Sequence, residues 1–176
     1  MGVAPVRSKL RSASVSYDPI RATSLSSLGK HTVLLLYKDG CPYCDAFFIY
    51  WNAVVSICSK FENANFVSIE KEELLNAMQA GESFGGNVKS YPTLRVVLHT
   101  AGKKLKLVSQ WDMDQEITDG PALTDRSRNG FSHYGIMDRD AFEREMVGSA
   151  DPEVSGVSVQ KLGLLLAFVR ESIAAS

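Results

Sequence analysis

The chain has 176 residues, of which 45% are hydrophobic, 22% charged and 9% aromatic. Such a composition can bury a core and argues against global disorder. With 19 basic and 20 acidic side chains, the net charge is −1, which offers no overall field to attract nucleic acid or an anionic membrane surface. The longest apolar run near the C-terminus, residues 164–169, is far shorter than the roughly 20 residues of a membrane-spanning helix. We therefore expect no contact with nucleic acid or membrane.

Residues 1–30 differ in composition from the rest of the chain. They hold five basic side chains, one acidic side chain and seven serines, and their apolar residues are dispersed without a helical period. Ordering such a segment costs roughly 1 to 2 kcal/mol per residue in backbone entropy, which the surface of one domain does not offset. We predict an extended basic arm over residues 1–30 that docks on an acidic surface of another protein chain, and one domain over residues 31–176.

The same segment bears on cellular location. An Arg- and Ser-rich, acid-poor start is typical of a flexible arm and also of an organelle transit peptide. It has no apolar stretch of the length that a secretory signal needs, and Val6 stands where N-myristoylation requires Ser or Thr. We expect an intracellular protein that is not secreted, in the cytosol, with an organelle or a virus particle as the alternative.

The domain begins with a predicted strand that runs into a Cys-x-x-Cys sequence. Residues 32–37 form a short apolar run typical of a buried strand, and residues 38–40 (Lys-Asp-Gly) are typical of a turn. Cys41-Pro42-Tyr43-Cys44 follows directly. Pro42 suits the first position of a helix because no amide hydrogen is needed there. The apolar face of the predicted helix consists of Cys44, Phe47, Phe48, Trp51, Val54, Val55 and Cys58.

A strand that leads into such a helix predicts thiol chemistry. At the helix N-terminus, Cys41 lies near unpaired amides and the positive end of the helix dipole, which favour the thiolate that attacks disulfides. Cys44, one turn further on, can reach the sulfur of Cys41 and release a mixed disulfide. Lys38 should lower the pKa of Cys41 and Asp45 should raise it, and the sequence leaves the sign of their sum open.

Half of a zinc site is the alternative interpretation of Cys41 and Cys44, because Cys-x-x-Cys also supplies two of four tetrahedral ligands. A second pair of ligands is missing, since the three histidines have no ligand spacing among themselves. Cys58, on the apolar helix face, is interpreted as a buried small hydrophobic residue. We therefore expect no metal site and no cofactor.

Cys41-Pro42-Tyr43-Cys44 resembles the active-site tetrapeptide of dithiol glutaredoxins, within the thioredoxin superfamily. Lys38 stands where glutaredoxins place a lysine that meets the glutathione carboxylate. The resemblance implies an α/β, thioredoxin-like fold in which a central mixed sheet is flanked by helices. It also implies that Cys41 and Cys44 are catalytic and that Lys38, Pro42 and Tyr43 contact the substrate.

A second segment resembles thioredoxins and protein disulfide isomerases. Residues 88–94, Val-Lys-Ser-Tyr-Pro-Thr-Leu, are similar to the segment that contains their cis-proline, and a strand over residues 94–98 with a hairpin at residues 101–103 follows. The resemblance implies a cis bond before Pro92 and places Pro92 beside the first cysteine. It implies that Tyr91 offers backbone hydrogen bonds to an incoming peptide or glutathione.

The resemblance covers residues 31–107 and, more loosely, residues 131–147, where Tyr134-Gly135 is similar to a last strand and Arg139 to the start of a final helix. The chain also departs from these families. Leu35 stands where thioredoxins have a buried acid, so proton transfer to and from Cys44 would need another route, such as water. The Gly-Gly and acidic pair with which glutaredoxins hold glutathione are absent, which weakens the case for glutathione dependence.

Two further segments complete the chain. Residues 109–130 carry five acidic side chains and the breaker Gly-Pro, and they are predicted to be an acidic loop inserted in the domain. Trp111 within it should either fold back on the domain or meet a partner. After the breaker Asp-Pro at residues 151–152, an amphipathic helix is predicted over about residues 158–174. Its apolar face is expected to cover the sheet, with a partner helix as the alternative.

The sequence supports two functional hypotheses. In the first, the protein is a thiol-disulfide oxidoreductase in which Cys41 attacks a protein disulfide or a glutathione mixed disulfide and Cys44 resolves the product. In the second, a thioredoxin-fold module keeps the sequence Cys41–Cys44 but serves as a structural or adaptor component of a large assembly, such as an organelle complex or a virus particle. The complete Cys-x-x-Cys sequence favours catalysis, and the basic arm and acidic insert favour assembly.

Overall fold

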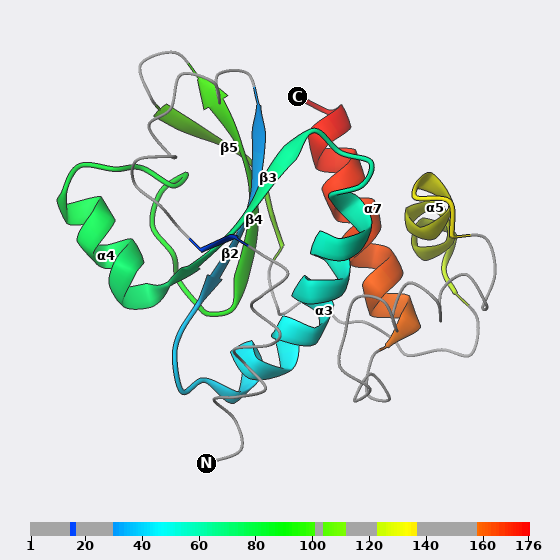
Figure 1. Cartoon of the computed structure of the whole chain (residues 1–176), viewed down its shortest axis with the longest axis horizontal. Coiled ribbons are helices and arrows are strands. Elements are labelled where there is room, and N and C mark those ends of the chain that lie inside the picture. Colours follow the sequence, from blue (N-terminus) through cyan, green and yellow to red (C-terminus); the bar gives the residue numbers. More distant parts are fainter. Residues whose placement is uncertain (1–14, 17–29, 101–103, 112–122, 137–157) are drawn as a thin grey trace.

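The computed structural model describes residues 15–16, 30–100, 104–111, 123–136 and 158–176 (Figure 1). The strands in these ranges form one mixed sheet in the order β1-β3-β2-β4-β5. The strands are β1 (Val15–Ser16), β2 (His31–Tyr37), β3 (Ala64–Glu70), β4 (Thr93–Thr100) and β5 (Lys104–Trp111). The helices are α3 (Pro42–Cys58), α4 (Lys71–Gln79), α5 (Asp125–His133) and α7 (Val159–Ala174).

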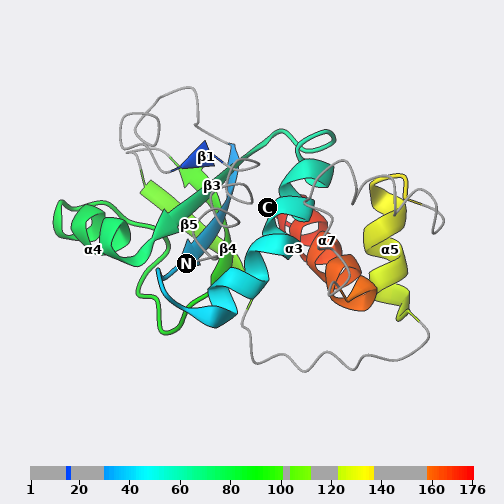
Figure 2. The ribbon, with the colours of Figure 1, turned by 60° about the horizontal axis from the view of Figure 1, so that its bottom comes forward.

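The sheet combines parallel and antiparallel pairs. β2 and β3 are parallel, so the chain must cross over between them, and α3 makes that crossover. β4 is antiparallel to both β2 and β5. Helices α3 and α7 cover one face of the sheet and α4 covers the other (Figures 1 and 2). The predicted fold class is confirmed: the chain has an α/β, thioredoxin-like fold with a central mixed sheet flanked by helices.

Strand β2 contributes to two cores because successive side chains of a strand point to opposite faces of the sheet. Val33, Leu35 and Tyr37 belong to the large core between the sheet and helices α3 and α7. Leu34 and Leu36 belong to a smaller core beneath α4. The strand that leads to Cys41 is therefore buried on both faces. Packing in both cores holds the end of β2 in place, and the turn before Cys41 starts from that end.

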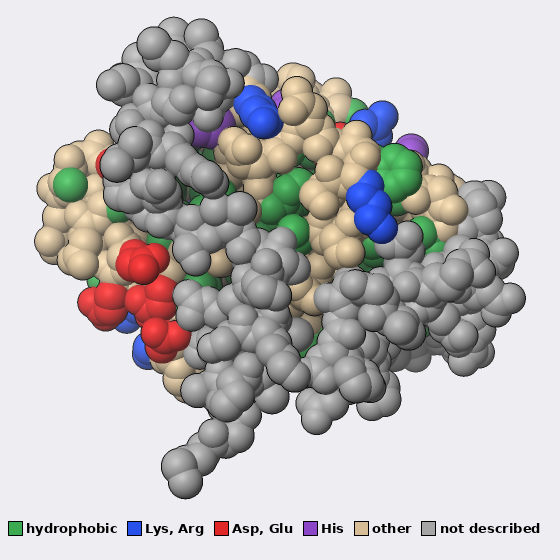
Figure 3. Space-filling view, in the orientation of Figure 1, with side chains coloured by type: hydrophobic (Ala, Val, Ile, Leu, Met, Phe, Trp, Pro, Cys, Tyr) green, Lys and Arg blue, Asp and Glu red, His purple; other side chains and the backbone are tan. Residues whose placement is uncertain are grey.

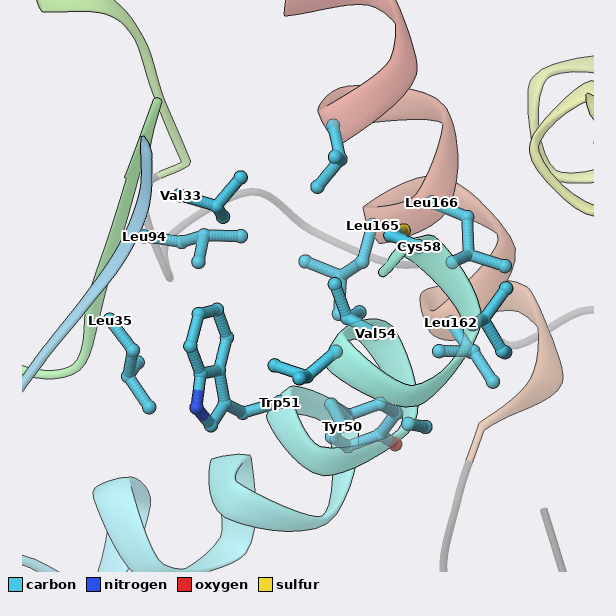
Figure 4. Close-up of a cluster of buried hydrophobic side chains, with 14 of the residues drawn as sticks. Val33, Leu35, Tyr50, Trp51, Val54, Cys58, Leu94, Leu162, Leu165 and Leu166 are labelled. Atoms are coloured by element: carbon cyan, nitrogen blue, oxygen red, sulfur yellow. The ribbon is translucent and has the colours of Figure 1, made fainter. Parts of the chain in front are cut away.

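The predicted apolar face of α3 is confirmed, since each of its seven residues is at most 5% exposed. Trp51 and Val54 point from α3 toward the sheet, where Leu35 and Leu94 meet them (Figure 4). The predicted C-terminal helix is also confirmed as α7, which begins where the side chain of Ser158 accepts a hydrogen bond from the backbone N–H of Lys161. Its apolar residues close the same core over the sheet: Leu162, Leu165, Leu166 and Val169.

Helix α5 packs against α7 on the side that faces away from α3 (Figure 2). The helices approach closely because two glycines meet at the crossing. An ideal Cβ at Gly130 would lie only 2.0 Å from the carbonyl oxygen of Gly163, and one at Gly163 would lie 2.7 Å from the carbonyl oxygen of Ser127. The hydroxyl of Ser127 donates to the carbonyl of Gln160 at 2.9 Å. This close contact leaves no room for a side chain at either glycine.

The prediction of a loop over residues 109–130 was wrong at its start, because residues 109–111 continue strand β5. A register shift between Val96 and Val97 places one extra residue in β5, which reverses the inward and outward alternation of its side chains. Trp111 consequently points into the large core, is 3% exposed and stacks edge-on with Phe168 at a centroid distance of 5.7 Å. Of the two predicted alternatives for Trp111, folding back on the domain is confirmed.

The same prediction was wrong at its end, because residues 125–130 form the first part of α5. This helix contains Asp, Ser, Asn and Gly, which have low helix propensity, so the sequence does not indicate it. Its N-terminus is stabilised by the side chain of Thr124, which accepts from the backbone N–H of Ser127. Docking on α7 supplies the remaining stability. Residues 112–122 lie outside the described residues.

The predicted last strand at Tyr134-Gly135 was also wrong, since these two residues form a turn that ends α5. Gly135 has a φ of +74°, which favours glycine. Tyr134 is buried, and its hydroxyl donates to the carboxylate of Glu62 at 3.1 Å. The segment thus packs on the end of α3 instead of extending the sheet, and the predicted helix near Arg139 lies outside the described residues.

The predicted arm over residues 1–30 is described at three residues only. Val15 and Ser16 form β1, which pairs in parallel with Val67 and Ser68 of β3. Lys30 precedes β2, and its carbonyl accepts from the backbone N–H of His99 at 3.0 Å. The predicted docking of this segment on another chain stays a prediction.

Candidate active site

Cys41 lies at the junction of β2 and α3. The turn at residues 38–40 brings the chain out of the sheet, and Gly40 takes a φ of +74° that favours glycine. Cys41 is the N-cap of α3 with extended backbone angles, and its carbonyl accepts from the backbone N–H of Asp45 at 3.1 Å. Pro42 occupies the first helical turn, as predicted from its missing amide hydrogen.

The position of Cys41 favours its thiolate. Partial burial of the sulfur opposes ionisation, but hydrogen bonds from the backbone N–H and the thiol of Cys44 and from the backbone N–H of Tyr43 outweigh it, and the pKa of Cys41 is lowered. The charge of Asp45 acts in the opposite direction and is the smallest contribution. Backbone donors at the helix N-terminus thus determine that the pKa of Cys41 is lowered and not raised, a direction that the sequence left open. Lys38 is exposed and does not contribute to the shift.

Cys44 is fully buried, whereas Cys41 is half-buried, and none of the three cysteines of the chain is in a disulfide. The sulfur of Cys44 accepts a hydrogen bond from the backbone N–H of Lys38 at 3.4 Å. The turn before the helix therefore holds the second sulfur behind the first. This arrangement is suited to a reactive outer thiol and a protected inner thiol.

The segment around Tyr91 lies against this thiol pair. The thiol of Cys41 donates to the carbonyl oxygen of Tyr91 at a distance of 4.0 Å. The bond between Tyr91 and Pro92 is cis, and Pro92 is buried. Two segments about 50 residues apart in sequence are thus brought together at one edge of the sheet. The backbone of Tyr91 therefore lies beside the sulfur of Cys41.

One side of the site is acidic. Glu70 accepts from the backbone N–H of Asp39 at 3.2 Å and from that of Glu72 at 2.6 Å. Burial raises the pKa of Tyr91, and the charges of Glu70 and Glu72 add to the rise while Arg95 opposes it. Figure 3 shows acidic side chains gathered at the start of α4, where these glutamates lie. The surface beside Tyr91 therefore carries negative charge.

The structure brings together some of the predicted site residues and leaves others apart. Cys41, Cys44 and Tyr91 are joined by the contacts above, and Pro42 and Tyr43 are exposed in the first turn of α3. Tyr43 is 72% exposed, the largest value among the exposed large hydrophobic residues of the described ranges. A predicted role of Lys38, Pro42 and Tyr43 in substrate binding remains a prediction.

Leu35 belongs to the same core as Cys44 and has no exposed surface. Its side chain lies opposite Trp51 (Figure 4), so an apolar contact stands where the resemblance would place a buried acid. The hydrogen-bond donors around the two sulfurs in the described residues come instead from backbone amides and from Cys44 itself.

The described part of the chain contains no group of three or more His, Cys, Asp and Glu side chains that could hold a metal ion. Cys58 lies on the far end of α3, fully buried. Burial is the main cause that raises the pKa of Cys58 to about 12, with the charge of Glu62 adding to it and a hydrogen bond from Tyr134 opposing it. Among the described helices, none combines the length and the apolar character needed to cross a membrane.

Arg95 and Glu70 are not among the site residues predicted from the sequence. Arg95 interrupts the apolar strand β4 and is only 3% exposed. A charged residue inside a predicted buried strand is a signal that could have identified it, because such residues are rarely buried without partners. Glu70 ends β3 at the same edge of the sheet as the cysteines, which only the strand order reveals.

No protein-family model matches the sequence, and a search of curated proteins gave no match. Among solved structures, the chain is similar to a thioredoxin from Thermus thermophilus, with 17% identity over 77% of this chain and 86% of that one and a TM-score of 0.39. It is similar to thioredoxin f from spinach chloroplast (short form), with 15% identity over 56% of this chain and 77% of that one and a TM-score of 0.38. It is also similar to the J-Trx1 fragment of ERdj5, with 13% identity and a TM-score of 0.38, where the match covers 58% of this chain and 45% of the fragment. The thioredoxin-like architecture itself rests on the strand order and on the position of α3.

Proposed function

We propose that the protein is a thiol-disulfide oxidoreductase. The Cys41 thiolate attacks one sulfur of a substrate disulfide, the substrate S–S bond breaks, and the other substrate sulfur leaves as a thiolate that takes a proton from solvent. Cys44 then gives up its proton and attacks the sulfur of Cys41. The mixed disulfide breaks, the second substrate thiol is released, and a Cys41–Cys44 disulfide remains. Two electrons have passed to the substrate, and an external dithiol returns the enzyme to its reduced form.

One observation carries this proposal: a half-exposed thiol with a lowered pKa accepts a hydrogen bond from a fully buried thiol, and neither is in a disulfide. A nucleophile must be partly ionised and accessible, and Cys41 meets both requirements. A resolving thiol must be close to the nucleophile and protected from competing reagents, and Cys44 meets both. A thiol pair held only for packing would need neither the amide donors nor the exposure of the first sulfur.

The proposed substrate is a disulfide in a polypeptide. The backbone of Tyr91 would hydrogen-bond an extended substrate segment, while Pro42 and the exposed ring of Tyr43 would line its path to Cys41. A glutathione mixed disulfide is a second substrate that Lys38 could attract through a carboxylate. The acidic surface near Tyr91 would repel the two carboxylates of glutathione, so the proposal favours a protein disulfide.

The test is the reduction of insulin disulfides with dithiothreitol as the reductant. Wild type should accelerate the reaction, and Cys41→Ser should abolish the acceleration. Cys58→Ala should retain it, because Cys58 is buried at the other end of α3. Replacing dithiothreitol by thioredoxin reductase with NADPH, and then by glutathione, identifies the electron donor. A wild-type rate no greater than that of Cys41→Ser would refute the proposal.

A second candidate function is a structural or adaptor role in a large intracellular assembly. The basic and serine-rich composition of residues 1–30 favours it, since such a segment is suited to an acidic partner surface. Deletion of residues 2–28 also removes the two-residue strand β1 at the edge of the sheet. It should leave insulin reduction unchanged and abolish recovery of the protein in a complex from its host cell. If wild type reduces no disulfide but requires this segment for assembly, the second function replaces the first. An intracellular location, in the cytosol, an organelle or a virus particle, is part of both proposals.

A further inference from the structure

Arg95 is a buried cation in the middle of strand β4, with only 3% of its surface exposed. It pairs with Leu34 of β2 and Gln110 of β5, so neighbouring strands flank it on both sides. Burial of a guanidinium is strongly unfavourable unless its donors are satisfied. The hydrogen-bond partners of Arg95 therefore show which part of the chain its side chain holds in place.

The guanidinium holds the loop between α4 and β4. One terminal nitrogen donates to the carbonyls of Phe84 and Gly86, at 3.0 and 2.7 Å. The other donates to the carbonyl of Asn87 at 2.6 Å, and Nε donates to the side chain of Gln110 at 2.7 Å. Three backbone carbonyls within four residues thus converge on one side chain, an arrangement that the planar fork of arginine satisfies and a lysine cannot.

The loop is shaped to accept this contact. Phe84 anchors it in the small core beneath α4, where its side chain is 2% exposed. Gly85 and Gly86 have φ values of +89° and +99°, which favour glycine. A Cβ at Gly85 would also lie 3.0 Å from the Cβ of Leu107 in β5. The loop is therefore pressed onto the sheet with its carbonyls turned toward Arg95.

The same loop leads into the candidate active site. Val88 packs against the small core. The carbonyl of Ser90 accepts a hydrogen bond from the hydroxyl of Thr93 at 2.6 Å, which holds Ser90 in place. The next residue is Tyr91, whose carbonyl accepts from Cys41. Only three residues separate the last carbonyl bound by Arg95 from Tyr91. The position of the Tyr91 backbone is consequently fixed from both sides, by Arg95 before it and by β4 after it.

We propose that Arg95 is a positioning residue for polypeptide substrates: it clamps residues 84–87 so that the backbone of Tyr91 is presented beside Cys41. The inference rests on the proposed oxidoreductase function. The side-chain hydrogen bonds of Arg95 described above go to residues 84–87 and Gln110, so the proposal gives Arg95 no step in the thiol chemistry. Its effect is on the binding of a substrate that uses the backbone of Tyr91, and a small disulfide without a peptide backbone is insensitive to it.

The test compares two substrates in Arg95→Lys, with dithiothreitol as the reductant. The first is a synthetic peptide disulfide that carries a fluorophore and its quencher on opposite sides of the S–S bond, and the second is hydroxyethyl disulfide. For the peptide we expect KM to rise about tenfold, as for the loss of about one good hydrogen bond, with kcat little changed. For hydroxyethyl disulfide, and for alkylation of Cys41 by iodoacetamide, we expect rates within about twofold of wild type.

A matched pair of glycine variants tests the clamp without changing the arginine. Gly86 and Gly81 both have positive φ values, +99° and +93°, and a Cβ at either would meet no atom within 4 Å. Gly86→Ala strains the backbone whose carbonyl Arg95 binds and should raise KM for the peptide as Arg95→Lys does. Gly81→Ala imposes similar strain at the end of α4 and should leave KM unchanged. These two glycine variants test the role of Arg95 even if Arg95→Lys does not fold.

The outcomes separate the two proposals. Wild type that reduces neither substrate refutes the oxidoreductase function, and the role of Arg95 falls with it. Wild type that reduces both, with a folded Arg95→Lys or Gly86→Ala whose peptide KM equals that of wild type, refutes the role of Arg95 alone. An equal loss of rate on both substrates also refutes it, because the residue would then act on the thiols or on the whole fold.

Discussion

The sulfur of Cys44 accepts a hydrogen bond from the backbone N–H of Lys38 at 3.4 Å and in turn donates its own proton toward the sulfur of Cys41. One buried thiol therefore links the turn before α3 to the candidate nucleophile. The position that would hold a buried acid by resemblance is occupied by Leu35, with no exposed surface. In the reduced protein the thiolate of Cys41 is thus stabilised by its neighbouring thiol and by helix amides, while the charge of Asp45 opposes it.

Removal of the Cys44 thiol should raise the pKa of Cys41. Burial alone raises this pKa, and the hydrogen bonds that overcome burial include one from the Cys44 side chain. In Cys44→Ala that bond is lost, less thiolate is present at neutral pH, and alkylation of Cys41 by iodoacetamide slows. The measurement is the alkylation rate of Cys41 against pH, followed by mass spectrometry, with Cys58→Ala as the control. A midpoint unchanged or lowered in Cys44→Ala would contradict this account.

The three cysteines should react with alkylating reagents in a fixed order. Cys41 is half-exposed and has a lowered pKa, so it should be modified first at neutral pH. Cys58 should be modified last, because burial raises its pKa to about 12 and leaves it without accessible surface. Peptide mapping after short exposures to iodoacetamide measures the order. Modification of Cys58 before Cys41 in the folded protein would be incompatible with the buried face of α3.

Much of the site could be predicted from the sequence because its signals are local. The apolar run before Cys41, the proline at position 42 and the three- and four-residue spacing after it define a strand, a helix start and a buried helix face. Each of these depends on neighbouring residues, and the structure confirms each. The helix N-terminus at Cys41 also favours a thiolate, but the direction of the pKa shift stayed open in the sequence because the balance against burial requires the structure.

The errors occurred where tertiary contacts override local signals. Trp111 points inward because of a register shift in β5 that no residue type announces. Helix α5 contains poor helix formers and is stabilised by its N-cap and by contact with α7. The contacts of Arg95 with residues 84–87 join a strand to a loop, so spacing in the sequence cannot reveal them. Each of these features depends on contacts between elements that are distant in the sequence, so no local pattern of residues indicates it.

Gly130→Ala should destabilise the protein although alanine is the better helix former by about 1 kcal/mol. The added Cβ would lie 2.0 Å from the carbonyl oxygen of Gly163, so α5 must move away from α7. We expect a loss of about 1 to 3 kcal/mol in the free energy of unfolding, the usual cost of an overpacked contact. Urea denaturation measures it, with Asn129→Ala, on the exposed side of the same helix, as the control. Stabilisation by Gly130→Ala would show that the two helices do not meet at these glycines.

The reduction potential of the Cys41–Cys44 pair is predicted to lie in the glutaredoxin range, about −200 to −230 mV. The Pro-Tyr pair between the cysteines resembles that of dithiol glutaredoxins, and the lowered pKa of Cys41 stabilises the reduced form, which raises the potential. Equilibration of the protein in glutathione redox buffers, with the thiol state read by mass spectrometry, measures it. A value near about −270 mV, typical of thioredoxin, would indicate that the segment around Pro92 determines the potential instead.

The most direct test of the central claim is the capture of the mixed disulfide. In Cys44→Ser the nucleophile remains and the resolving thiol is gone, so incubation with insulin should accumulate a covalent adduct in which Cys41 is joined to an insulin cysteine. Digestion without reduction, followed by mass spectrometry, identifies the linked peptides. We expect this adduct to form at Cys41 and to be released by dithiothreitol, with no adduct in the double variant Cys41→Ser, Cys44→Ser. An adduct at Cys58, or none in Cys44→Ser, would contradict the account.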